Sequence, residues 1–175
     1  MLIDPLLLDE AGWEALDAVV DGPVETLVTI PYHTRSAEQA RRRYGGSIWG
    51  HRAVARRLED PESLRVIAPG EELPGGASAH RIGNPVRYEM PIFVPELRAL
   101  VFGDAVVGTD GGLRVWTQGR VTGRRGDWYE RRLIPSLRPL LDLDGERVLV
   151  THGPSVLGGG RRALERALAA GPWPG

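Results

Sequence analysis

Three polar residues whose side chains can take part in chemistry follow apolar runs of the sequence. His33 lies beyond one run, Asp104 follows a second after one glycine, and His152 follows a third. In open α/β sheets, ligands bind outside the carboxyl ends of the strands. If the three runs are strands of such sheets, His33, Asp104 and His152 lie where a ligand would bind.

The stretch 24–51 positions His33 and reads as strand, polar turn, helix, strand. Residues 24–30 are apolar and rich in β-branched side chains, which is typical of a buried parallel strand. Pro31 ends this strand because proline has no N–H for the sheet ladder. Ser36 is predicted to cap a helix over 37–44, which carries Ala, Glu, Gln and Arg.

The rest of the chain alternates similar elements at both ends, with a meander of strands between them. A helix predicted over 128–141 contains Pro135 and Pro139, so it should be kinked or split. This alternation predicts an α/β sandwich. The segment 2–8, which Asp4-Pro5 interrupts, is predicted to be a strand running into a turn. The other predicted strands cover 47–49, 64–68, 79–82, 87–94, 99–102 and 147–151. The other helices cover 10–20, 51–58 and 161–169, and 113–126 is predicted to be irregular.

Composition limits the classes of function. A chain of 175 residues predicts one domain. The net charge of −1 does not favour nucleic acid as a partner, and no apolar run is long enough to predict a membrane span. The acidic start of the sequence is unlike a signal peptide, so a cytoplasmic location is expected. The chain lacks cysteine and lysine, which excludes thiolate and Schiff-base chemistry.

Three segments of the sequence are informative together: LIDPL at the start, FVPELRALVFGDAVVG in the middle and RVLVTHGP near the end. These segments resemble the metallo-β-lactamase fold superfamily of glyoxalase II-like hydrolases. The resemblance implies an αββα sandwich forming a single domain over 1–175. It also implies truncation at the N-terminal hairpin, because this chain begins where the second or third strand of the family would lie.

The metal motif of the family, H-x-H-x-D-H, is altered here. His33 falls on a spacer position, and Asn84 aligns with the next histidine ligand of the family. Only Asp104 and His152 match. The resemblance therefore implies a chain that has lost its metal site, has no cofactor and acts as a non-catalytic domain binding a small molecule or a protein. The four positions of the altered motif are occupied by Ile30, Tyr32, Thr34 and Arg35.

In this metal-free reading, Tyr32, Arg35 and Asn84 are the predicted ligand-binding residues. Arg35 replaces the metal as the counter-charge of Asp104, because a buried carboxylate needs a partner. The hypothesis is a hydrogen-bonded network of Asp104, Arg35 and His152.

Two alternatives remain open, and whether the chain is an enzyme stays undecided. In one, the chain is a hydrolase with a rearranged mono-metal site built from His33, Asp104 and His152. With zinc bound there, it would cleave an ester or thioester. In the other, the missing hairpin leaves a sheet edge open, and the chain is a structural or regulatory subunit that forms a homodimer.

Overall fold

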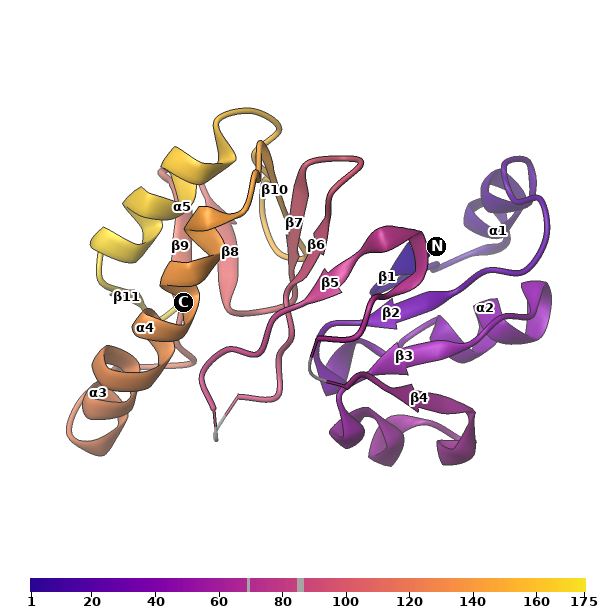
Figure 1. The fold of residues 1–175 in the computed structure, drawn as a ribbon, viewed down its shortest axis with the longest axis horizontal. Coiled ribbons are helices and arrows are strands. Elements are labelled where there is room, and N and C mark those ends of the chain that lie inside the picture. Colours follow the sequence, from indigo (N-terminus) through magenta and orange to yellow (C-terminus); the bar gives the residue numbers. More distant parts are fainter. Residues whose placement is uncertain (69, 85–86) are drawn as a thin grey trace. The chain divides into compact units, whose positions relative to one another are not determined.

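A computed structural model describes residues 1–68, 70–84 and 87–175. The contacts divide the chain into two compact units, Met1–Ala68 and Pro69–Gly175, and each is described by itself (Figure 1). The predicted organisation as one domain over 1–175 stays a prediction. Among the described residues, no helix combines the length and apolar character needed to cross a bilayer.

Unit 1 is built on a parallel sheet with the order β1-β2-β3-β4. Its central strand β2 is buried on both faces, as expected for an apolar run in a parallel sheet. Four predicted strands of this unit are confirmed in place, although each is shorter than predicted or shifted by a residue. Their bounds are β1 (Leu2–Ile3), β2 (Thr26–Val28), β3 (Ile48–Gly50) and β4 (Leu64–Val66).

Helix α2 (Ala37–Tyr44) has the predicted bounds and packs beside β2 and β3. The predicted capping role of Ser36 is wrong. Its hydroxyl instead accepts a hydrogen bond from the Leu7 N–H, at 3.0 Å, and makes no bond to the helix. Ser36 therefore ties the start of α2 to the segment that follows β1.

Helix α1 (Glu10–Asp17) is shorter than the predicted helix over 10–20. Asp9 caps it by accepting from the Gly12 N–H. Trp13 is buried, whereas Val19 lies beyond the helix and is 77% exposed. The predicted helix over 51–58 is the 3₁₀ helix η2 (Arg52–Arg57), which His51 caps through Nδ1.

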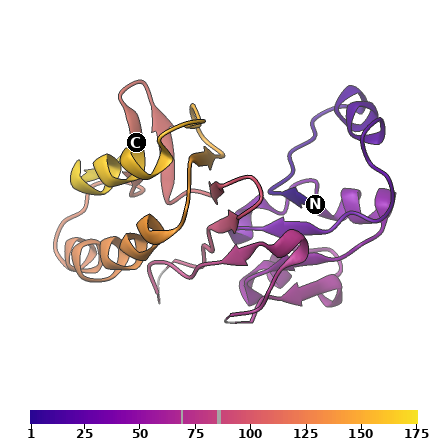
Figure 2. The same ribbon diagram turned by 45° about the horizontal axis from the view of Figure 1, so that its top comes forward.

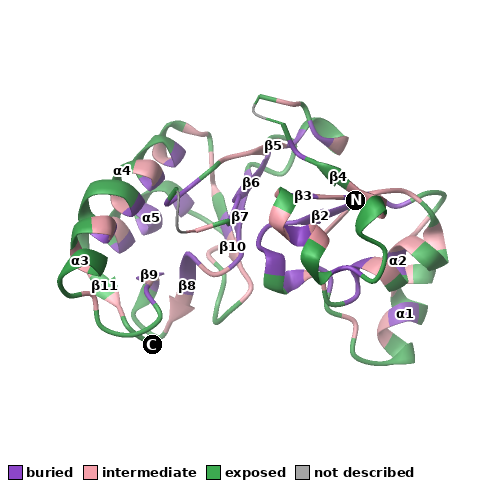
Figure 3. Ribbon diagram, turned by 90° about the horizontal axis from the view of Figure 1, so that it is seen from below, coloured by how far each residue is buried: buried purple, intermediate pink, exposed green. Residues whose placement is uncertain are grey.

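The described residues of unit 2 form two sheets, with the orders β10-β7-β6-β5 and β11-β9-β8. Its helical segments lie side by side (Figures 1 and 2). Their apolar side chains belong to one core cluster with side chains of these sheets. Figure 3 shows β6 and β7 buried along their length. The strands are β5 (Ser78–Ala79), β6 (Ile92–Val94), β7 (Ala99–Phe102), β8 (Val106–Thr109), β9 (Gly112–Trp116), β10 (Arg147–Val150) and β11 (Pro172–Trp173).

The prediction that 113–126 is irregular is wrong at its start. Strand β9 pairs antiparallel with β8 in a hairpin. Asp110-Gly111 lies between the two strands and is a common hairpin turn sequence. Leu113 and Val115 alternate as buried residues along β9, a pattern with the two-residue period of a strand.

The helix predicted over 128–141 begins earlier and is split, which confirms the expected interruption. The run changes hydrogen-bonding pattern several times, and Pro135 and Pro139 lie near the start of its last two pieces. The pieces are α3 (Arg124–Trp128), the π-helical turn η5 (Tyr129–Leu133), α4 (Ile134–Leu137) and the 3₁₀ turn η6 (Arg138–Asp142), and the last helix is α5 (Gly160–Ala169).

Candidate functional site

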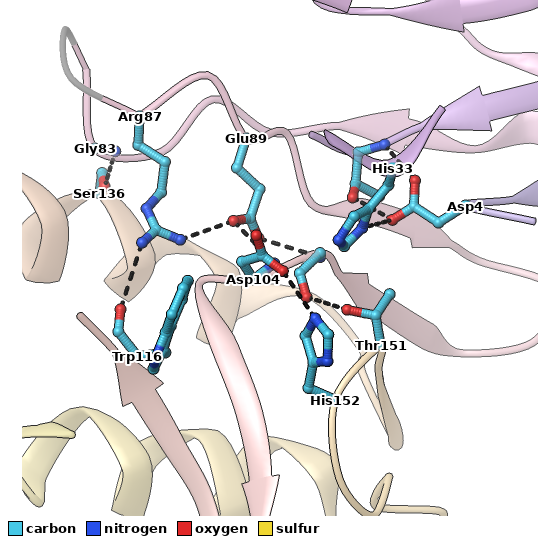
Figure 4. Close-up of polar contacts among 12 residues, drawn as sticks. Asp4, His33, Gly83, Arg87, Glu89, Asp104, Trp116, Ser136, Thr151 and His152 are labelled. Atoms are coloured by element: carbon cyan, nitrogen blue, oxygen red, sulfur yellow. Dashed lines mark hydrogen bonds and ion pairs between the residues drawn. The ribbon is translucent and has the colours of Figure 1, made fainter. Parts of the chain in front are cut away.

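His33 lies in unit 1 at the end of the 3₁₀ helix η1 (Pro31–His33), which follows β2. Its side chain is buried, and its Nδ1 is 2.9 Å from Oδ2 of Asp4 (Figure 4). A carboxylate beside Nδ1 favours the tautomer in which Nδ1 carries the proton and donates to Asp4. In this tautomer Nε2 has the lone pair that can bind a cation.

Asp4 is a site residue that sequence reasoning missed. It follows β1 with a φ of 48°, and its carboxylate is buried. Besides His33, it accepts hydrogen bonds from the backbone N–H of Thr29, at 2.8 Å, and from the Thr29 hydroxyl. Asp4 therefore fixes the segment between β2 and His33. The Asp-Pro pair after the first apolar run was the only sequence signal for this turn.

The other predicted site residues of unit 1 lie at its surface. Tyr32 is 65% exposed, and the guanidinium of Arg57 is 4.5 Å from the centroid of its ring. Arg35 is exposed and has a φ of 26°, which is unusual for a residue other than glycine. Ile30, at a ligand position of the family motif, is buried and aliphatic.

In unit 2 the structure brings Asp104 and His152 together. Asp104 follows β7 and His152 follows β10, and these strands are parallel neighbours with Phe102 opposite Val150. Nε2 of His152 lies 3.3 Å from Oδ1 of Asp104. The Thr151 hydroxyl donates to the Gly103 carbonyl at 2.6 Å, which joins the two strand ends (Figure 4).

Glu89 is the second residue that sequence reasoning missed. Its carboxylate is fully buried and accepts from the backbone N–H groups of Gly103 and Asp104, both at 3.2 Å. The Arg87 guanidinium lies 2.9 Å from it. Burial raises the pKa of Glu89, and the positive charge of Arg87 opposes this shift. Glu89 thus holds the backbone on which Asp104 is placed.

Gly108 and Gly153 position the loop that carries His152. The Gly108 N–H donates to the His152 carbonyl at 2.8 Å. Gly153 has a φ of 73°, and a Cβ there would overlap the carbonyl oxygen of Gly108. The close approach of two backbones requires glycine at this position.

We expect Gly153→Ala to lower the free energy of unfolding by about 1–3 kcal/mol, through backbone strain and overlap. Gly171 has a similar φ of 75° with nothing within 4 Å of a Cβ, so Gly171→Ala is a matched control for strain alone. Urea denaturation of both variants measures the difference. If both variants lost the same free energy of unfolding, the close approach of the Gly108 and Gly153 backbones would not contribute to stability.

The structure tests the predicted roles of Asn84 and of the Asp104–Arg35–His152 network only in part. Asn84 is exposed in unit 2, next to Gly83, which accepts from Trp128 Nε1 and donates to Ser136 Oγ. Its predicted contact with a ligand stays a prediction. The predicted Asp104–Arg35–His152 network joins residues of both units and also stays a prediction, while its Asp104–His152 part is present within unit 2.

The sequence matches no protein-family model and no curated protein. Several solved structures are similar to it. The chemotaxis sensor ODP from T. denticola, in a peroxy diiron form, matches with a TM-score of 0.68 and 12% identity, over 96% of this chain and 81% of its own. The archaeal metallo-β-lactamase superfamily protein ST1585 from Sulfolobus tokodaii matches with a TM-score of 0.62 and 16% identity, over 87% and 69%.

A third similar structure is the metallo-β-lactamase family protein TTHA1429 from Thermus thermophilus. Its TM-score is 0.59 at 16% identity, over 96% of this chain and 69% of its own. At this level of identity the likeness concerns the fold. The segments that resembled the superfamily in sequence also form the expected elements, since β7 leads into Asp104 and β10 into His152. This chain therefore has the metallo-β-lactamase fold.

Proposed function

We propose that this chain binds one divalent metal ion through His33, Asp104 and His152 and hydrolyses an ester or thioester. Two imidazoles and a carboxylate are a common donor set of catalytic zinc sites, which keep a further position for water. When bound, such a metal supplies Lewis acidity and lowers the pKa of its water to about 7.

The observation that carries this proposal is the contact between Asp4 and His33. A histidine that binds a metal usually donates its other ring N–H to a carboxylate, which fixes the tautomer and the ring orientation. Asp4 does this for His33 inside unit 1, at 2.9 Å, with both side chains buried. The residues therefore fit a metal-binding imidazole.

The residues of unit 1 do not fit a second metal of the kind named in the diiron form of ODP. Ile30 offers no donor atom, and Tyr32 and Arg35 are exposed. This favours a mono-metal site. It also supports the second candidate function, in which the fold has lost its metal and serves as a non-catalytic domain that binds a small molecule or a protein.

Elemental analysis decides between the two functions. Protein purified without chelator is offered zinc, manganese and iron, and about one bound metal ion per chain is expected. His33→Ala and Asp104→Ala should each lose it. His80→Ala is the control, because His80 is half-buried in unit 2 and its Nε2 lies 3.1 Å from Ser78 Oγ.

The outcome also directs the search for activity. A metal retained by His80→Ala and lost by the other two variants supports the hydrolase and calls for a screen of esters and thioesters. No bound metal in the unaltered protein would contradict the mono-metal site and leave the non-catalytic domain as the function to test.

A further inference from the structure

The net charge of the chain conceals a strongly basic stretch in unit 1. The whole chain has a net charge of −1, but residues 30–58 contain only one acidic side chain, Glu38. Such local asymmetry creates a positive potential that attracts anions. The same stretch holds seven arginines, at Arg35, Arg41, Arg42, Arg43, Arg52, Arg56 and Arg57.

Three of these arginines are paired with carboxylates on the outer side of α2. Arg41 pairs with Asp60 at 3.7 Å, Arg42 with Glu59 at 3.2 Å, and Arg43 with Asp17 and Glu10. Their charge is locally balanced, so they form a solvated network of surface ion pairs.

The other four arginines are exposed and have no such partner. Within unit 1, whose residues 1–68 are all described, no carboxylate lies within 4.0 Å of their guanidinium nitrogens. These four, together with one aromatic residue, form what we call the arginine edge: Tyr32, Arg35, Arg52, Arg56 and Arg57.

The topology gathers the arginine edge at one end of the sheet. The 3₁₀ helix η1 follows β2 and η2 follows β3, so both lie at the carboxyl ends of neighbouring parallel strands. The two 3₁₀ helices pack against each other, and the Arg57 guanidinium stacks on the Tyr32 ring at 4.5 Å. The carboxyl ends of the strands are where open α/β sheets bind ligands.

The stack at Tyr32 differs from the two other cation–π pairs of unit 1. Arg43 lies over Trp13, but it also pairs with two carboxylates. Arg65 lies over Trp49 from within the edge strand β4. Arg57 is the one arginine of unit 1 that stacks on an aromatic ring, has no carboxylate partner in the unit and lies at the carboxyl ends of the strands. Three further unpaired arginines belong to the same arginine edge. Stacking holds the guanidinium plane while its N–H groups remain able to donate at their edge.

These features favour a phosphate group as the ligand. One guanidinium satisfies a carboxylate through two parallel hydrogen bonds. Several unpaired guanidinium groups suit a ligand that has more oxygens than a carboxylate and carries up to two negative charges. Phosphate is such a ligand, and the guanidinium group matches its geometry. The arginine edge has four cations, and no carboxylate of unit 1 lies within ion-pairing distance of them. It is therefore better matched to a phosphate group than to a carboxylate.

We propose that the arginine edge binds the phosphate group of a small molecule. Tyr32 directly precedes His33, so a molecule held there is placed at the ligand-bearing end of the sheet. That this molecule is the substrate of the metal centre rests on the proposed function, whereas phosphate binding by unit 1 does not.

The test measures binding of inorganic phosphate to the full chain, freed of metal with a chelator that is then removed, by isothermal titration calorimetry at low ionic strength. Arg57→Gln and Arg56→Gln should each raise the Kd by about tenfold or more, the size of one charge-assisted hydrogen bond. Binding should weaken as salt is added. Arg65→Gln is the matched control, since it removes an exposed, stacked arginine elsewhere in unit 1 and should leave the Kd unchanged.

The proposal would be overturned if the unaltered protein did not bind phosphate, if Arg57→Gln bound it equally well, or if Arg65→Gln lost binding to the same extent. Acetate serves as the carboxylate probe, and binding of acetate as tightly as phosphate would also overturn it in favour of a carboxylate ligand. Because the protein is metal-free, failure of the metal centre leaves this result unaffected, and metal content measured on Arg57→Gln tests the metal centre separately.

Discussion

Replacing Glu89 by alanine is expected to lower the free energy of unfolding by about 3–5 kcal/mol, the range for a buried ion pair that loses one partner. The variant leaves the mostly buried Arg87 without its carboxylate and removes the acceptor of the Gly103 and Asp104 N–H groups. An arginine cannot shed its charge by losing a proton, so the penalty cannot be relieved. Denaturation by guanidinium chloride, monitored by circular dichroism, measures the loss.

Arg87→Ala separates the two roles of Glu89. In that variant the carboxylate still accepts both backbone N–H groups, and Glu89, whose pKa burial already raises, can take up a proton. We therefore expect a smaller loss, of about 1–2 kcal/mol. If Arg87→Ala costs as much as Glu89→Ala, the ion pair, rather than support of the Asp104 backbone, is the main contribution.

The elements that carry Asp104 and His152 could be predicted because local signals determine them. Strand 99–102 is an apolar run between a turn and a glycine, and its bounds agree with β7. Helix 37–44 likewise combines helix formers with a glycine after its end and agrees with α2. Parallel neighbours necessarily place the residues after their carboxyl ends close together, which is why Asp104 and His152 meet.

Glu89 and Asp4 could not be predicted because long-range contacts determine their burial. A charged residue in an extended segment such as 87–94 is normally exposed. Glu89 is buried because it accepts from backbone groups fourteen and fifteen positions away in the chain. Asp4 similarly depends on Thr29 and His33, at separations of 25 and 29. A single sequence carries no signal for such pairings.

Asp4→Asn is expected to weaken metal binding by about 10- to 100-fold, the usual effect of removing a carboxylate that supports a metal-binding histidine. An amide NH₂ facing Nδ1 of His33 would donate to it, and the proton would move to Nε2. That nitrogen then has no lone pair for a cation. Asparagine tolerates the φ of 48° at this position, so the fold should change little. Titration with zinc in the presence of a competing chelator measures the affinity.

The tautomer of His33 is a second measurement. It should change in Asp4→Asn if Asp4 sets the position of the imidazole proton, and it should not change if Asp4 only supports the fold. ¹⁵N NMR of the metal-free protein should show the proton on Nδ1 in the unaltered chain and on Nε2 in Asp4→Asn. Asp4→Ala is the contrasting variant, because it orphans the buried Thr29 N–H and should lower the free energy of unfolding by about 1–3 kcal/mol. If Asp4→Asn changes the tautomer but leaves zinc affinity unchanged, His33 is not a metal ligand. If neither changes, the contact at Asp4 supports only the loop after β2.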